Sequence, residues 1–104
     1  MVIWTDNAIS HITEFIDDIG KDTEKTAKTY MNKLVDYVDI LESMPEIGKK
    51  IDYIIANYEI RQMIYKKHRI IYYIKENDTV VLAVLHTRLD IDKALRRLKR
   101  NLEK

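Results

Sequence analysis

Residues 80–85, Val-Val-Leu-Ala-Val-Leu, are the longest apolar run in the 104-residue chain. Such a run is far shorter than the ~20 residues that span a bilayer, and it suits a strand that is covered on both faces. The pattern therefore predicts a strand over residues 79–87 that lies inside a β-sheet, and the rest of the fold has to be arranged around it.

Stretches rich in Ile, Val and Tyr precede this strand at residues 51–55, 58–66 and 68–75. They follow Gly48, where the period of the apolar residues changes from helical to two, and short polar breaks separate them. Three strands with two short connections predict an antiparallel meander. The run at residues 2–4 is also prone to form a strand.

Apolar residues recur every three or four positions in the N-terminal half, which predicts two helices joined as an antiparallel hairpin. Thr5 or Asp6 is suited to cap the first helix, and Gly20 to end it. Pro45 and Gly48 stop the second helix, because proline disfavours helix at the residue before it and glycine permits the turn. The apolar stripes are Ala8, Ile9, Ile12, Phe15, Ile16 and Ile19, then Ala27, Tyr30, Met31, Leu34, Val38 and Leu41.

A third helix is predicted to begin at Asp90 or Asp92, with an aliphatic stripe and a basic opposite face. The stripe is Ile91, Leu95, Leu98 and Leu102, and the basic residues are Lys93, Arg96, Arg97, Lys99, Arg100 and Lys104. These elements predict an α+β fold in the order β-α-α-β-β-β-α. An N-terminal helical hairpin packs on a small antiparallel β-sheet, a C-terminal helix follows, and all helices lie on one face.

Charge is distributed unevenly along the chain. Residues 1–47 carry a net charge of −6 and residues 48–104 one of +7, although the whole chain carries only +1. A basic half can present a positive face to phosphate polymers or acidic peptides. Alternatively, the two halves interleave in space and give an ordinary mixed surface.

Composition excludes several classes of protein. The chain has no cysteine, so it has no disulfide scaffold, thiolate zinc site or cysteine nucleophile. Its N-terminus lacks the features of a signal peptide, its histidines and carboxylates lack metal-ligand spacings, and it carries no nucleotide-binding glycine motif. We therefore expect residues 1–104 to form a single cytoplasmic domain with no metal, no cofactor and no membrane contact.

The candidate chemistry lies at the ends of the strands. His86 and Arg88 are two residues apart, so the period of two places them on one face, while Arg61 and Arg69 fall on the two preceding strands. Arginines beside a histidine could hold an RNA phosphate and transfer a proton near neutral pH. Alternatively, the arginines pair with surface carboxylates and the histidine forms a strand-end hydrogen bond, since these residues make up no specific motif.

The ordered segments of the chain resemble the RelE/ParE superfamily, the toxins of type II toxin–antitoxin or plasmid-stabilisation modules. The resemblance runs nearly end to end, over Val2-Ile-Trp-Thr5, Leu41-Glu-Ser-Met-Pro-Glu-Ile-Gly48, Glu59-Ile-Arg61, Arg69-Ile-Ile-Tyr72 and Val84-Leu-His-Thr-Arg-Leu-Asp90. It implies a RelE/ParE-like fold and a growth-inhibiting toxin that forms a hetero-oligomer with a cognate antitoxin protein.

Members of this superfamily divide by target. RelE-like toxins are mRNA interferases that cut messenger RNA on the ribosome, whereas ParE-like toxins are associated with DNA gyrase. The turn at Met44–Gly48 and the ending at Leu85–Asp90 are more similar to the ParE branch. Arg69 and Arg88 fall where RelE-like nucleases carry phosphate-binding arginines, but their C-terminal tyrosine has no match, because Ala94 is the nearest aligned position.

Two functions of different classes follow from the resemblance. The favoured one is a ParE-like toxin that inhibits DNA gyrase by binding, with contacts from Arg61, Arg69, Arg88, Arg96, Arg97 and Arg100. The other is a metal-independent, ribosome-dependent endoribonuclease in which Arg61, Arg69 and Arg88 hold phosphate and His86 transfers the proton. The sequence leaves open whether the protein is an enzyme.

Overall fold

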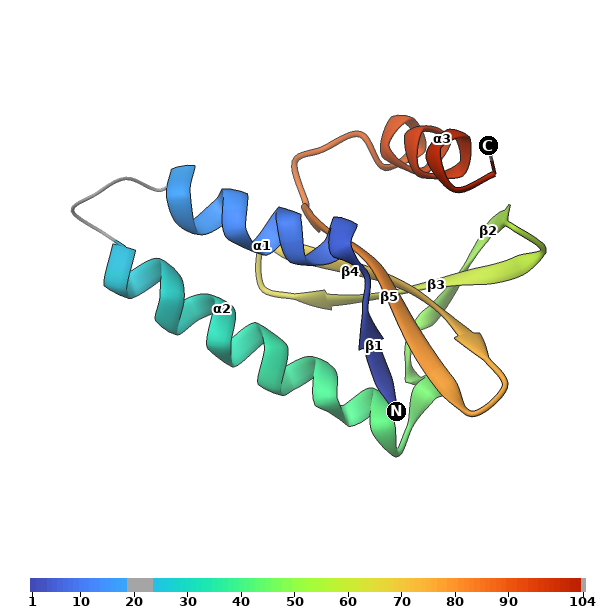
Figure 1. The fold of residues 1–104 in the computed structure, drawn as a ribbon, viewed down its shortest axis with the longest axis horizontal. Coiled ribbons are helices and arrows are strands. Elements are labelled where there is room, and N and C mark those ends of the chain that lie inside the picture. Colours follow the sequence, from blue (N-terminus) through green and yellow to red (C-terminus); the bar gives the residue numbers. More distant parts are fainter. Residues whose placement is uncertain (19–23, 104) are drawn as a thin grey trace.

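The computed structural model describes residues 1–18 and 24–103, and in this part of the chain the strands form one five-stranded sheet (Figure 1). The strand order is β1-β5-β4-β3-β2, in which β1 pairs with β5 in parallel and all other pairs are antiparallel. The strands are β1 Val2–Trp4, β2 Lys49–Ile55, β3 Tyr58–Tyr65, β4 His68–Lys75 and β5 Asp78–His86, and the helices are α1 Asp6–Asp18, α2 Glu24–Val38 and α3 Ile91–Leu102.

The apolar run is confirmed as an internal strand. β5 lies between β1 and β4, and every side chain from Thr79 to Leu85 is buried. The strand is bulged, because Ile71 pairs with Ala83 and Tyr72 with Val81, which leaves Leu82 unpaired in the register.

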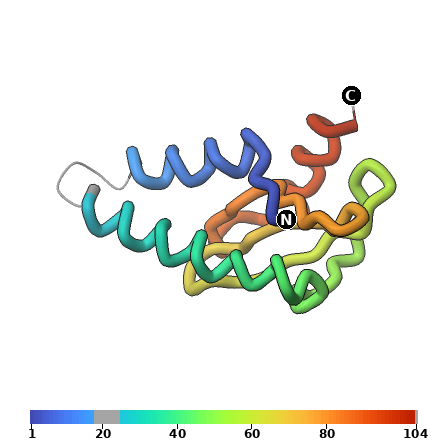
Figure 2. Tube along the Cα trace, turned by 60° about the horizontal axis from the view of Figure 1, so that its bottom comes forward, coloured from blue at the N-terminus to red at the C-terminus, as the bar shows by residue number. Residues whose placement is uncertain are grey.

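The helices lie on both faces of the sheet, so the expectation that all of them share one face was wrong. α1 and α2 run side by side and cover the face that carries Ile70 and Val84 (Figure 2). α3 packs through Leu95 and Leu98 on the other face, against Ile71. The physical reason lies in β5, since a strand that is apolar on both faces needs cover on both.

Two further expectations about the sheet need correction. The sheet is mixed rather than antiparallel, because the short β1 pairs in parallel with β5. Four strands, not three, follow Gly48, since Lys49–Ile55 pairs with β3 as an edge strand. The β-rich stretch at residues 51–55 indicates this strand, but the predicted element order does not include it.

The helix starts that the sequence predicted are confirmed where the structure describes them. Thr5 caps α1: its Oγ1 accepts a hydrogen bond from the N–H of Ala8 at 3.2 Å. The Asp90 carboxylate accepts from the N–H groups of Asp92 and Lys93, so α3 begins at Ile91. The predicted stop at Gly20 lies outside the described residues.

The helical half of the chain ends in a corner at Pro45–Gly48. We call this corner, together with the side chains of Arg61 and Tyr72, the Gly48 corner. α2 stops at Val38, two short 3₁₀ segments follow at Asp39–Glu42 and Pro45–Ile47, and β2 begins directly afterwards. Within the described residues, no helix combines the length and the apolar character that crossing a membrane requires.

Candidate functional site

The end of β5 brings two histidines together. His86 pairs with His68 of β4 in the register, and their ring centroids are 5.3 Å apart. Both rings lie on the face that the helical hairpin covers, because Phe15 of α1 packs edge-on against His68 at 4.7 Å. The sequence had singled out His86 but not its partner, since the strand register that pairs them is a long-range property.

His68 is a buried and neutral member of this pair. The residue is 3% exposed, and its Nδ1 shares a 2.8 Å hydrogen bond with the hydroxyl of Tyr30 on α2. Burial, and to a lesser degree the neighbouring His86, lowers the pKa of His68 to about 4. His68 therefore carries no charge at neutral pH and belongs to the packing of the hairpin against the sheet.

His86 is half-buried and its orientation is fixed by the turn that follows β5. Its Nδ1 accepts a hydrogen bond from the backbone N–H of Arg88 at 3.0 Å, and its carbonyl accepts from the N–H of Leu89 at 3.0 Å. Because Nδ1 is the acceptor, the proton of the neutral ring resides on Nε2. His86 can thus present an N–H donor to a bound molecule.

Arg88 joins His86 at this end, although by a different route from the predicted alternation. β5 ends at His86, and the exposed Arg88 lies in the following turn. Both residues line a hollow of about 460 Å³ that is walled mainly by apolar and aromatic side chains. The other lining residues are Phe15, Thr26, Ala27, Tyr30, Lys66, Lys67 and His68.

Arg69 does not join them. Side chains alternate along a strand, so Arg69 points to the α3 face while His68 points to the hairpin face. Its guanidinium donates to the Gln62 side chain on β3 at 3.0 Å, and its Nε is buried with no hydrogen-bond partner in the described part of the chain. The structure thus places Arg69 on the opposite side of the sheet from His86.

Arg61 lies at the Gly48 corner and is engaged there. Its guanidinium donates to the carbonyl oxygens of Gly48 at 2.9 Å and Glu46 at 3.1 Å. Arg61 pairs with Tyr72, four residues along β4 from His68, which places it roughly 13 Å from the histidine pair. This arginine holds the backbone of the corner.

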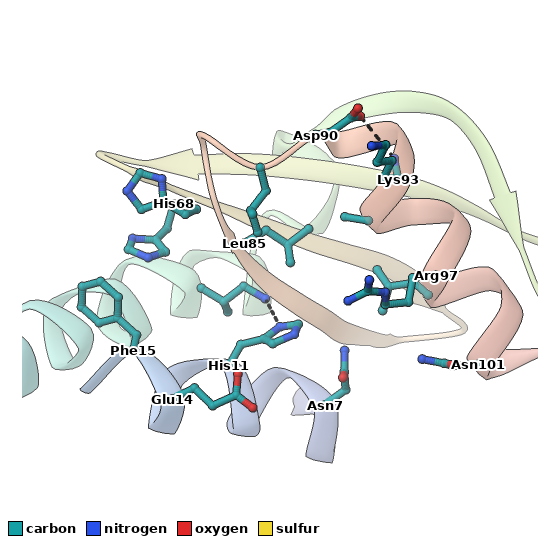
Figure 3. Close-up of a pocket in the computed structure, with 15 residues that line it drawn as sticks. Asn7, His11, Glu14, Phe15, His68, Leu85, Asp90, Lys93, Arg97 and Asn101 are labelled. Atoms are coloured by element: carbon teal, nitrogen blue, oxygen red, sulfur yellow. Dashed lines mark hydrogen bonds between the residues drawn. The ribbon is translucent and has the colours of Figure 1, made fainter. Parts of the chain in front are cut away.

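The arginines of α3 divide between two sides of the helix. Arg97 lines a second hollow, of about 510 Å³, between α1 and α3, together with Lys93 and Asn101 (Figure 3). Arg96 and Arg100 are exposed and do not line it. The sequence had grouped all three as one basic face, and it gave no sign that Lys93, Lys66 and Lys67 would border the hollows.

Side chains of α1 cover the free edge of β5. The sequence did not predict this contact. β1 pairs only as far as Val81, and beyond it side chains of α1 take the place of a strand. The Asn7 amide donates to the carbonyl of Leu82 at 2.9 Å. The N–H of Val84 donates to Nδ1 of His11 at 3.2 Å (Figure 3). Burial lowers the pKa of His11, which favours the neutral ring that this contact needs.

The site offers hydrogen-bond donors and cations. Within residues 1–18 and 24–103, no three His, Asp or Glu side chains gather as ligands. The cations and N–H donors at the end of β5 can bind anions, and the hollow beside them can accept an apolar side chain.

Comparison with known proteins agrees with this architecture. Residues 2–91 match the family model of the ParE toxin of the type II toxin–antitoxin system parDE. No curated protein matches the sequence. The match covers most of the chain, from β1 to the start of α3, and the ParE family pairs each toxin with an antitoxin. The chain therefore belongs to the ParE toxin family and is the toxin of a type II toxin–antitoxin system.

Proposed function

We propose that the protein acts as a toxin by binding DNA gyrase and blocking it, without turnover of its own, until a cognate antitoxin neutralises it. The observation that carries the proposal is the separation of the three arginines that a nuclease would need. Arg88 lies in the turn beside His86, Arg69 faces the opposite side of the sheet, and Arg61 bonds the Gly48 corner.

RNA cleavage requires donors that converge on one phosphate. They have to lie about 3 Å from the oxygens on which charge develops, together with the group that moves the proton. Of the arginines named for that role, only Arg88 lies beside His86. Arg61 would first have to leave the two backbone carbonyls that it bonds. This geometry favours a binding toxin over a nuclease.

A surface for the target is available on the C-terminal side. Arg88, Arg96, Arg97 and Arg100 are exposed, and in the described part of the chain none of their guanidinium groups bonds a carboxylate. Unpaired arginines retain their charge and fork geometry for a partner's carboxylates or for DNA phosphates. Gyrase, as an enzyme bound to DNA, offers both kinds of group.

Induced expression in growing cells tests the target. DNA synthesis and protein synthesis are followed separately after induction, and purified toxin is added to a gyrase supercoiling assay. We expect DNA synthesis to stop first, DNA damage signalling to rise, and supercoiling to fall with toxin concentration. Immediate arrest of translation with cleaved messages, and full supercoiling at excess toxin, would contradict the proposal.

A further inference from the structure

Two adjoining rows of cations run along α3. Lys93 and Arg97 border the second hollow, and Arg96 and Arg100 lie beside them on the outer side of the helix. Neighbours within a row are four residues apart and neighbours across the rows are three apart, so the four side chains lie close together. All four residues are exposed. We call them the α3 basic surface.

The helix that carries this surface is fixed on the sheet. Leu95 and Leu98 are buried in the core between α3 and the sheet. The Asp90 carboxylate caps the first turn, and beyond the last turn the Glu103 carboxylate accepts a hydrogen bond from the N–H of Ala56 at 2.8 Å. Figure 1 shows α3 at the edge of the molecule, away from the helical hairpin. The basic surface is therefore held in place and is open to a partner.

The charge on α3 works against the stability of the helix. Like charges three or four residues apart repel each other and weaken a helix. Ile91–Leu102 contains five cations and a single carboxylate, Asp92. In the described part of the chain, no residue of the basic surface forms an ion pair, and the only α3 cation that does is Lys99, with Glu103. A bound polyanion would relieve this repulsion, so the charge pattern indicates a binding surface.

The chemistry of the surface favours phosphate groups over an acidic protein. Protein interfaces bury an apolar core in addition to their charges. On the helix, Arg96 and Arg100 have only charged neighbours, at positions 92, 93, 97, 99 and 103, so they offer no apolar contact. Three of the four cations are arginines, whose planar fork bonds two oxygens of one phosphate. These residues therefore suit a phosphate backbone.

The dimensions of the surface fit a duplex. Positions 93 to 100 extend over about 10 Å of helix axis. Duplex DNA presents about six phosphates over that length, which is enough for each of the four cations to meet one. The match to the ParE family model ends at residue 91, so membership of the family does not account for this surface.

We propose that the α3 basic surface binds the phosphate backbone of duplex DNA without reading its sequence. The inference rests on the proposed function for its consequence, which is that the toxin contacts the DNA held by gyrase as well as the enzyme. Each of the four cations neutralises one phosphate. Because two carboxylates, Glu14 and Asp90, line the hollow beside the inner row, the outer row of Arg96 and Arg100 contributes most.

The salt dependence of DNA binding tests the surface. Full-length toxin is titrated into a short fluorescent DNA duplex of mixed sequence, and the anisotropy is followed between about 50 and 200 mM salt. Four neutralised phosphates give a slope of about −3.6 in the logarithm of affinity against that of salt concentration. We expect Arg96→Gln with Arg100→Gln to reduce the slope to about −1.8. The same double variant should weaken binding at the lowest salt at least tenfold.

Two further double variants are the matched controls. Lys25→Gln with Lys33→Gln removes the same charge from exposed positions on α2, so it should leave the slope unchanged and alter the affinity less than twofold. Arg96→Lys with Arg100→Lys keeps the charge and loses the fork, so it should keep the slope and lose only part of the affinity. All three double variants should keep the wild-type melting temperature, because the altered side chains are exposed.

The outcomes separate this inference from the proposed function. A wild-type toxin that does not bind the duplex at low salt overturns the DNA site, and so does an unchanged slope in Arg96→Gln with Arg100→Gln. Tighter binding to a single-stranded RNA of the same length also overturns it, as does a loss of binding to DNA-free gyrase with intact DNA affinity. If the toxin binds the duplex with the expected slopes but leaves supercoiling intact, the DNA site stands and only the target is wrong.

Discussion

The Gly48 corner and the end of β5 at His86 use the same kinds of side chain in opposite ways. At the corner, Arg61 and the Tyr72 hydroxyl bond backbone groups of Pro45–Gly48 at 2.8–3.1 Å. At the other end, Arg88 lies exposed without an ion pair in the described part of the chain. A cation that bonds carbonyls of its own chain stabilises the fold, whereas an unpaired one is available for a partner.

Replacing Gly48 is expected to have the largest effect on stability. A Cβ at this position would lie 2.7 Å from Tyr72 Cε1 and 2.8 Å from the backbone oxygen of Gln62. Gly48 has an extended backbone conformation, so the constraint is space and not backbone strain. We expect Gly48→Ala to lower the free energy of unfolding by about 3 kcal/mol, measured by urea denaturation.

The companion variant Tyr72→Phe checks this explanation. It removes a hydroxyl that donates to the Pro45 carbonyl and accepts from the Gly48 N–H, so it should cost about 2 kcal/mol by itself. It also clears space, and the double variant should therefore cost less than the sum of the single ones. Additive losses would show that the crowding lies elsewhere, and a loss below 1 kcal/mol for Gly48→Ala would contradict the packing of the corner.

Acid should weaken the end of β5 through His68. Its pKa is about 4 in the folded protein against an ordinary value of 6.5, so the unfolded chain binds the proton more tightly. The contribution of neutral His68 to the free energy of unfolding is fully present above pH 6.5. It is lost as the pH drops from 6.5 to 4 and changes little below pH 4, with a total loss of about 3 kcal/mol. Denaturation series at pH 7, 5.5 and 4 measure the slope.

A variant identifies the titrating group. His68→Phe keeps an aromatic ring against Phe15 and removes the ionisable nitrogen, so most of the slope between pH 6.5 and 4 should vanish. A smaller slope should remain, because burial also lowers the pKa of His11. A slope that equals that of the unaltered protein would assign the acid sensitivity to other groups.

How much of the two regions could be predicted depends on the range of the interactions. The internal strand at residues 80–85 and the helix starts at Thr5 or Asp6 and at Asp90 or Asp92 follow from near neighbours in the chain, and the sequence predicted them. The pairing of His68 with His86 depends on the register between strands, which local patterns leave undetermined. The sequence also did not predict which face of the sheet α3 covers, because the apolar stripe of a helix does not specify the surface against which the helix packs.

The candidate residues show the same limit. The sequence placed His86 and Arg88 on one face of a strand by the period of two, whereas the structure ends β5 at His86 and brings Arg88 beside it through a turn and a backbone hydrogen bond. Arg69 was expected near them from its family position, but its neighbour His68 takes the hairpin face and alternation sends Arg69 to the other. The roles of these arginines in toxicity stay predictions.

Arg61→Ala should lower the free energy of unfolding by an intermediate amount, as expected for a side chain that stabilises the Gly48 corner. It loses two charge-assisted hydrogen bonds to carbonyl oxygens, which should cost about 1–2 kcal/mol of unfolding free energy. Arg61→Lys keeps the charge but not the fork, and should recover only part of the loss. Toxicity of both variants should track their stability; a toxicity loss with intact stability would return Arg61 to the target contacts.

Arg88→Ala should have the smallest effect on stability and a clear effect on function. The side chain is exposed, so the free energy of unfolding should change by less than about 0.5 kcal/mol. Arg88→Ala should weaken the inhibition of gyrase supercoiling. His86→Ala removes the acceptor for the Arg88 N–H, and it should weaken the inhibition by no more than the loss of one binding contact. A nuclease that used His86 for proton transfer would instead lose 10²–10⁴-fold in rate, on the order expected for general acid–base catalysis. If Arg88→Ala unfolds the protein, or leaves a folded toxin at full strength, then the contrast between a paired corner and an available end is broken, and the exposed face of α3 becomes the better target surface.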